Sequence, residues 1–260
     1  MKRTTLILIL IASLIILFIP SCSSRGHEVK MVTIPAGSFS MGQTGIAEPV
    51  HTVTLSAFSM SAYEITQRQF FDIMGSNRPY FKGLSGDNLP VEQVNWWEAI
   101  KYCDALSAKA GLQPCYDEST GYCDLTKSGF RLPMEAEWEY ACRAGTTSNY
   151  YTGNLESDLA IAGWYSSNSG DKPHPVGRKT PNAWGLYDMH GNAGEWCNDW
   201  YKSYSSASAV NPTGAKISPD RVVRGGAWYS GGSACRSAAR AVSPPSGGSK
   251  NFGLRVVHRP

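Results

Sequence analysis

Residues 191–200 read GNAGEWCNDW, and residues 221–248 read RVVRGGAWYSGGSACRSAARAVSPPSGG. The first stretch is dense in tryptophan, acidic residues and Asn-Gly turn signals. The second begins with an apolar pair between two arginines and continues mainly in small residues. Turn signals and aromatic bulk together are typical of irregular but ordered backbone. The first stretch therefore indicates a rigid scaffold, and the second a segment of small residues with few reactive side chains.

Two segments before these stretches alternate apolar residues with polar or small ones. They are MVTIPAGSFSMG at residues 31–42 and HTVTLSAFSMSAYEIT at residues 51–66. A period of two is typical of strands, so a hairpin is predicted near the N-terminus. The apolar run FGLRVV at residues 252–257 is expected to close the same sheet, which would bring the two ends of the domain together.

Capping signals predict three helices. They start at Thr66, Asn95 and Pro133 and stop at Gly75, Gly111 and Gly145. Cys103 and Cys142 lie on the apolar faces of the second and third helices, where buried free thiols are favoured. Glu135 and Glu139 are interpreted as an exposed i, i+4 pair. From residue 146 to 219 the chain reads as long loops that need aromatic packing to be ordered.

The length of 260 residues favours one domain of about 230 residues after a leader. In the leader, Lys2 and Arg3 precede the apolar run Leu6–Ile19, which is too short to span a membrane. After Pro20 and Ser21 comes Cys22, a small residue followed by cysteine as in bacterial lipoproteins, and an ordinary signal peptide is the alternative. We therefore predict a signal peptide at residues 1–21, a tether at 22–30 and a single domain at 31–260.

This leader predicts an exported chain, anchored to the bacterial envelope by a lipid on Cys22 and facing the outer surface. Membrane contact through the lipid alone is expected. Removal of Lys2 and Arg3 with the leader leaves 22 basic and 21 acidic residues, a balance near +1. A net charge this close to zero gives no reason to expect nucleic acid as a partner.

Six cysteines remain besides Cys22, and export allows disulfides to persist. Cys115 and Cys123 flank YDESTGY and could clip a hairpin. Cys197 and Cys235 lie inside the two opening stretches. Spacing alone does not give the connectivity, and free buried thiols are the alternative.

Six sequence blocks carry a family resemblance. In order, they read MVTIPAGSFSMG, YEITQRQF, PVEQVNWWEAIKYC, GFRLPMEAEWEYACRAG, NAWGLYDMHGNAGEWCNDWY and RVVRGGAW. With the C-terminal NFGLRVV, they resemble the formylglycine-generating-enzyme, or sulfatase-modifying factor, family over residues 31–257. The resemblance implies an α+β protein with an elaborated C-type lectin-like fold: a small antiparallel sheet, a few helices and extensive ordered loops.

The resemblance also implies a structural calcium ion. The matching ligands would be the side chains of Asp188 and Glu195 and the backbone carbonyls of Gly191 and Ala193. Calcium prefers six to eight oxygen ligands and accepts carbonyls from an irregular loop. The alternative is that both acids cap turns and pair with arginines. In related non-oxidase members, the cysteine that matches Cys235 bonds to the one that matches Cys197, so this pair is a candidate disulfide.

No active site is predicted. The family's oxidases bind copper with two cysteines, and the first of these places falls on Ser230, which leaves Cys235 alone. The histidines are scattered and are interpreted as surface or turn residues; they are His27, His51, His174, His190 and His258. An enzyme, specifically an oxidase of the formylglycine-generating type, is therefore the least favoured hypothesis.

The small residues of the second stretch suggest a different role. In relatives, the positions that match these small residues are rich in asparagine. Mutation of asparagine codons only at adenine gives tyrosine, serine, glycine, alanine or valine. Diversity-generating retroelements vary binding surfaces in this way, and the chain resembles the variable treponemal lipoproteins that they diversify. The predicted ligand-binding positions, within a variable segment at about residues 221–258, are Trp228, Tyr229, Ser230, Gly231, Ser233, Ala234, Ala239, Ala241, Val242 and Ser246.

The favoured hypothesis is thus a non-catalytic, surface-displayed lipoprotein that binds a ligand through this hypervariable segment. The expected ligand is a protein or another cell-surface molecule, and the expected state is a monomer. A fixed envelope lipoprotein of the same fold, with a structural or assembly role, is the main alternative.

Overall fold

The central strand β4 (Phe58–Ser61) joins the two ends of the domain. In the computed structural model, which describes residues 28–81 and 88–259, β4 pairs with β1 (Met31–Ile34) on one side. On its other side it pairs with β12 (Val257–His258), also antiparallel. The prediction that the first and last strands share a sheet is confirmed.

The predicted N-terminal hairpin is also present, as β2 (Gly37–Gln43) and β3 (Ala47–Leu55). A short parallel strand, β8 (Ala209–Val210), extends it. Each alternating sequence segment is divided between two sheets, because β1 and β4 form one antiparallel pair and β2 and β3 another.

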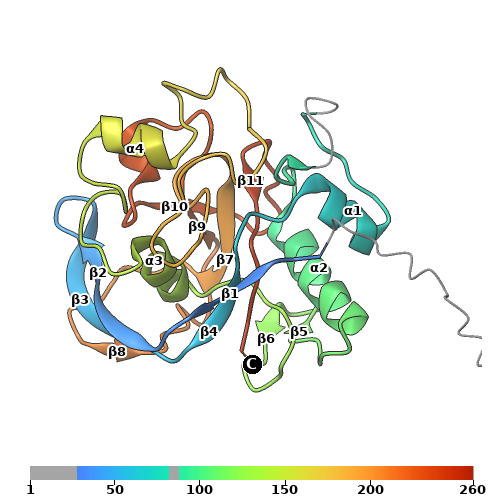
Figure 1. The fold of residues 1–260 in the computed structure, drawn as a ribbon. Coiled ribbons are helices and arrows are strands. Elements are labelled where there is room, and N and C mark those ends of the chain that lie inside the picture. Colours follow the sequence, from blue (N-terminus) through green and yellow to red (C-terminus); the bar gives the residue numbers. More distant parts are fainter. Residues whose placement is uncertain (1–27, 82–87, 260) are drawn as a thin grey trace, which may run out of the picture.

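A four-stranded sheet, separate from the two above, brings the two opening sequence stretches side by side. Its order is β10 (Arg240–Ser243), β9 (Arg221–Arg224), β7 (Gly194–Trp200) and β11 (Phe252–Gly253). β7 and β9 are antiparallel, and β10 is an edge strand. In Figure 1 this sheet and helix α3 lie between the β2–β3 hairpin and the helices α1 and α2.

The helices are α1 (Gln67–Met74), α2 (Trp96–Lys109), α3 (Glu135–Arg143) and α4 (Glu156–Ala162). The capping boxes at Thr66 and Asn95 form as predicted. The third helix begins at Glu135 rather than Pro133, because Met134 is extended and the Pro133 carbonyl accepts the N–H of Asn198. Helix α4 was not predicted. Within the described ranges, no helix has the length and apolarity needed to cross a membrane.

Two hydrophobic clusters form the core, one around α2 and one around α3. Buried indoles from the tryptophan-rich strand join the elements around them. Trp196 donates from Nε1 to the carbonyl of Val94 at 2.8 Å, and Trp96 donates to the carbonyl of Cys197 at 3.0 Å. Both N–H groups are thereby satisfied inside the core, so β7 and the start of α2 are fixed to each other.

A small hairpin of β5 (Tyr116–Asp117) and β6 (Tyr122–Cys123) projects beside α2. The predicted signal peptide at residues 1–21, the lipidation site Cys22 and residues 22–27 of the tether lie outside the described residues.

Candidate binding surface and its scaffold

Asn192 joins the loop before β7 to the segment predicted to vary. Its carbonyl accepts the N–H of Trp228 at 2.9 Å, and its N–H donates to the carbonyl of Trp164. Its side chain accepts from the N–H of His174 and donates to Glu64, at 2.8 and 2.6 Å. The residue is fully buried with a φ of 58°, a conformation that asparagine tolerates better than most residues.

Buried charges lie directly beneath this loop. Glu195 receives two hydrogen bonds from Arg255, at 2.5 and 2.6 Å, and one from the indole of Trp138 at 2.6 Å. Glu64 and Asp188 are close enough to Glu195 for their charges to interact. Three buried carboxyl groups therefore face one guanidinium, and Glu64 is a member that the sequence analysis missed.

The electrostatics of this cluster follow from its burial. Burial, and then the charges of Asp188 and Glu195, hold the pKa of Glu64 well above its ordinary range. Burial also raises the pKa of Asp188 to about 6. The cluster is short of positive charge, because Arg255 pairs with Glu195, and neither Glu64 nor Asp188 forms an ion pair within the described residues, although Lys179 is close enough to affect the pKa of Asp188.

These residues can be compared with the predicted calcium ligands Asp188, Gly191, Ala193 and Glu195. Asp188 Oδ1 is buried and has no hydrogen-bond partner among the described residues, whereas Oδ2 accepts the N–H of Gly177 at 2.6 Å. An unpaired carboxylate oxygen in a cluster short of positive charge fits a cation. Residues 28–81 and 88–259 contain no group of three or more His, Cys, Asp or Glu placed to hold a metal, but the predicted set has only two acids. The calcium ion stays a prediction.

The residues predicted to bind a ligand divide into exposed and buried positions. The exposed ones are Tyr229, Gly231, Ser233, Ala234, Ala241, Val242 and Ser246, and Ser230 is half-buried. Trp228 and Ala239 are buried, with exposed fractions of 5% and 9%, so their prediction as surface contacts is wrong. Trp228 is held inward by its bond to Asn192, and Ala239 precedes the edge strand β10.

An aromatic patch adjoins the exposed loop. Trp228 packs edge-on against Phe81, at 5.3 Å between ring centroids, and against Tyr229 at 5.5 Å. Tyr80 packs on Phe81 and is 59% exposed, and Tyr229 is 50% exposed. The ammonium group of Lys250 lies 4.9 Å from the Tyr80 ring. Tyr80 and Phe81 were missed, although two adjacent aromatics after a helix stop were a visible signal.

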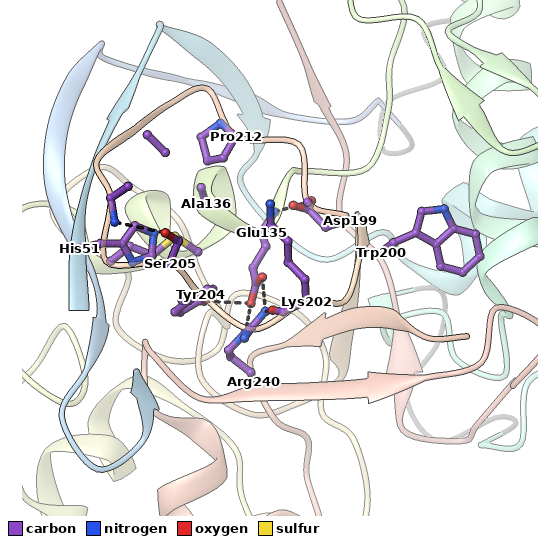
Figure 2. Close-up of a pocket in the computed structure, with 14 residues that line it drawn as sticks. His51, Glu135, Ala136, Asp199, Trp200, Lys202, Tyr204, Ser205, Pro212 and Arg240 are labelled. Atoms are coloured by element: carbon purple, nitrogen blue, oxygen red, sulfur yellow. Dashed lines mark hydrogen bonds and ion pairs between the residues drawn. The ribbon is translucent and has the colours of Figure 1, made fainter. Parts of the chain in front are cut away.

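Ala241 and Val242 lie elsewhere, on β10, so the predicted positions do not form one loop. Arg240, at the start of β10, pairs with Glu135 at 2.6 and 2.8 Å and stacks on Tyr204. Figure 2 shows these groups at a cavity of about 90 Å³, where Asp199 also accepts the N–H of Glu135. The charged groups at this cavity are thus used to fix β10 to α3.

The prediction that Glu135 and Glu139 form an exposed pair is wrong, since both are buried. Glu139 pairs with Arg224 at 2.5 Å and with Arg143 at 2.8 Å. Both glutamates point from α3 into the sheet that carries the variable segment. Arginines distant in the sequence supply the compensating charge, so a helix-surface pattern could not reveal the burial.

The predicted disulfides are not formed. Cys197 and Cys235 are buried free thiols that pack in different hydrophobic clusters. Burial raises the pKa of Cys235 to about 12, so this thiol is protonated at neutral pH. Cys115 and Cys123 are also free, although their thiols are hydrogen-bonded to each other. The expected free, buried state of Cys103 and Cys142 is confirmed.

His190, interpreted as a surface or turn residue, lies in the loop before β7 but is fully buried rather than at the surface. Its Nδ1 lies 2.7 Å from the carbonyl of Cys235, and its Nε2 lies 3.1 Å from the N–H of Tyr151. This arrangement requires that Nδ1 donates and Nε2 accepts, which is the neutral imidazole. Burial accordingly lowers the pKa of His190 to about 4.

The family model of the sulfatase-modifying factor enzyme 1-like domain matches residues 20–260. The chain belongs to this family. It is similar to a formylglycine-generating enzyme of Bos taurus, with 30% identity over 88% of this chain and 74% of that protein. It is also similar to the chaperone protein LppX of Paenibacillus barcinonensis, with 31% identity over 98% of this chain and 99% of that one.

Two solved structures share the fold of this chain. Treponema denticola variable protein 1 superposes with a TM-score of 0.84 at 34% identity, over 88% of this chain and 95% of that chain. PvdO from Pseudomonas aeruginosa gives a TM-score of 0.74 at 27% identity, over 88% and 94%. The predicted α+β fold of this family is confirmed.

Proposed function

We propose that this chain is a non-catalytic binding protein of the sulfatase-modifying factor family, exported and held at the bacterial surface by a lipid on Cys22. Its ligand, a protein or another cell-surface molecule, contacts the loop Tyr229–Ala234 and the aromatic patch of Tyr80, Phe81 and Tyr229. The likeness to a treponemal variable protein supports a surface that changes in sequence between copies.

The observation that carries this proposal is that exposed residues of the loop lie between buried residues that hold its two ends. Tyr229, Ser233 and Ala234 face solvent, whereas Trp228 and Cys235 on either side are buried. A preformed backbone lowers the cost of ordering a loop on binding, and exposed side chains can change without disturbing the core. Tyr229 is the one large aromatic among the predicted variable residues that faces solvent, so it is the main anchor of this version.

The absence of catalysis is part of the proposal. Ser230 occupies the first cysteine place of the family's oxidases, and its hydroxyl accepts the N–H of Ala227 at 3.0 Å to close a turn. Cys235 is buried and protonated. One protonated thiol does not provide the pair of thiolates that a copper site of this kind needs.

A substitution series at the protein level tests the scaffold. Tyr229→Ser, Ser233→Tyr and Ala234→Asp should each change the free energy of unfolding by less than about 0.5 kcal/mol, as surface changes do. The matched buried control, Trp228→Ala, should cost about 3 kcal/mol. Exposed substitutions that cost as much as the control would contradict a variable surface.

Sequencing of the 3′ end of the gene and its flanks tests diversification itself. A nearly identical noncoding copy that differs only at its adenines, with changes in the codons for residues 229–234 and 239–246, is the expected result. No such copy, together with an identical segment in sister strains, would favour the second candidate. That candidate is a fixed envelope lipoprotein with an assembly role, which the similarity to a chaperone protein supports.

A further inference from the structure

A groove of about 600 Å³ lies between the β5–β6 hairpin and the segment of residues 213–216. Its lining contains none of the predicted ligand-binding positions and none of the aromatic patch, although Arg221 is the first residue of the predicted variable segment. The volume is in the range of small-molecule sites, which combine apolar walls with a few placed polar groups. Tyr122, Leu125, Met134 and Trp200 supply apolar wall, and Arg221 supplies a charge.

Arg221 is the first residue of β9 and is only 2% exposed. Its guanidinium lies between the indoles of Trp96 and Trp200, at 3.6 and 3.5 Å from their ring centroids. Nη1 donates to the carbonyl of Asn198, whereas Nε is buried without an acceptor in the part of the chain that the structure describes. The two rings fix the plane of the guanidinium group, whose N–H groups form a fork that can bind both oxygens of a carboxylate. A buried N–H without an acceptor costs free energy until a hydrogen bond forms.

Arg221 also lacks a counter-charge. Arg131, Arg224 and Arg255 are buried to the same degree, and each has a carboxylate within 2.7 Å. Among residues 28–81 and 88–259, no carboxylate lies within 4.0 Å of Arg221. These three buried arginines are thus neutralised by the fold, and Arg221 is not.

Asp199 is near Arg221 and Asp124 lines the groove, but neither forms an ion pair with Arg221. Burial, and then the charge of Glu135, raise the pKa of Asp199 to about 8, so its carboxyl is neutral at neutral pH. Asp124 lines the groove, and hydrogen bonds from the hydroxyl and the N–H of Thr126, at 2.7 and 3.0 Å, lower its pKa and keep it ionised. Its carboxylate is thus directed to Thr126 and forms no ion pair with Arg221 within the described residues. Burial lowers the pKa of Arg221 to about 10, which reflects the cost of its uncompensated charge. Lys216, at the exposed edge of the groove, adds a second positive charge.

We propose that this groove binds a small organic anion, whose carboxylate pairs with the fork of Arg221 while its body packs against Trp200 and Tyr122. A planar guanidinium held between two rings suits bidentate recognition of a carboxylate. This site is independent of the variable surface, and the inference does not rest on the proposed function.

Calorimetric titration of the full chain with sodium benzoate tests the proposal, with benzamide as the neutral isostere of the same shape. Benzoate should bind saturably at one site, with a dissociation constant of about a millimolar for so small a ligand. Benzamide should bind at least about tenfold more weakly, because it cannot form charge-assisted hydrogen bonds with Arg221.

Two variants locate the site. Arg221→Lys keeps the charge but removes the fork, and should weaken benzoate about tenfold. Thr213→Trp, at an exposed position on the groove wall, leaves Arg221 in place and should block binding by filling the groove. If Arg221→Lys fails to fold, Thr213→Trp decides alone, with a circular dichroism spectrum as the check on its fold.

Inorganic phosphate is the competing probe. If phosphate displaces benzoate, the groove is a general oxyanion site. If phosphate does not displace it, the groove is selective for carboxylates. In both outcomes Arg221 remains the residue that binds the anion. The proposal is overturned if benzoate does not saturate, if benzamide binds equally well, or if folded Thr213→Trp binds benzoate like the wild type.

Discussion

The backbone carbonyl of Asn192 accepts the N–H of Trp228 at 2.9 Å, and this bond joins the tryptophan-rich stretch to the segment proposed to vary. Around it, Gly191 donates to the carbonyl of Gly225 at 2.7 Å. The loop that precedes β7 therefore supports the start of the variable segment from below. The backbone behind Trp228 is thus fixed by hydrogen bonds that do not involve the side chains of residues 229–234.

Asn192→Ala should lower the free energy of unfolding by about 1–3 kcal/mol, because it leaves Glu64 and the N–H of His174 without their buried partner. The loss should be measured by urea denaturation, and limited proteolysis should report a more open chain at residues 228–239. The exposed Asn88→Ala is the control, with an expected change near zero. Equal stability of both variants would show that Asn192 does not hold the segment.

Added calcium should raise the melting temperature, because an ion that binds only the folded state stabilises it by mass action. Asp188→Ala removes the unpaired Oδ1 and should lower the melting temperature in calcium and abolish its dependence on calcium. Differential scanning calorimetry with chelator and with excess calcium is the measurement. Identical melting of the wild type in both conditions would exclude an exchangeable ion.

Asp199 should make the protein less stable as the pH rises. Its pKa is about 8 in the folded state and near 3.9 in the unfolded chain, so the folded state holds the extra proton. This contribution to stability is therefore complete at low pH and is lost as the pH rises from about 4 to 8. Asp199→Asn keeps an acceptor for the N–H of Glu135 and removes the titration.

The variant should thus gain stability relative to the wild type between pH 5 and pH 9, measured by urea denaturation at several pH values. Asp171→Asn, on an exposed turn, is the control and should keep a constant difference from the wild type. A constant difference for Asp199→Asn as well would mean that the Asp199 carboxyl is already ionised at pH 5.

Thiol labelling should distinguish the cysteines. Cys197 and Cys235 should both react with iodoacetamide in denaturant without reductant, since they lie in separate clusters as free thiols. Mild oxidation with diamide should instead join Cys115 to Cys123, whose thiols contact each other. Peptide mapping by mass spectrometry reads both results. Recovery of a linked Cys197–Cys235 peptide pair would contradict the structure.

Local sequence signals determined much of the fold. Caps at Thr66 and Asn95 fixed the starts of two helices, and a period of two identified the N-terminal hairpin, because both depend on residues close together in the chain. Ordered blocks placed the chain in its family. Helix α4 was missed because it is short and lies among loop signals, and because Leu155, the N-cap residue before its first residue Glu156, makes no side-chain capping bond.

The burial of polar groups was decided only by the tertiary structure. Glu135 and Glu139 read as a solvated helix pair, yet Arg240 and Arg224 from distant strands neutralise them inside the protein. His190 is also buried, by contacts with Cys235 and Tyr151. Arg221 shows the reverse case, because the fold encloses its charge between two indoles and no carboxylate of the described residues pairs with it. A sequence specifies which residues carry charge, but whether a charge is compensated depends on distances between segments that only the folded chain brings together.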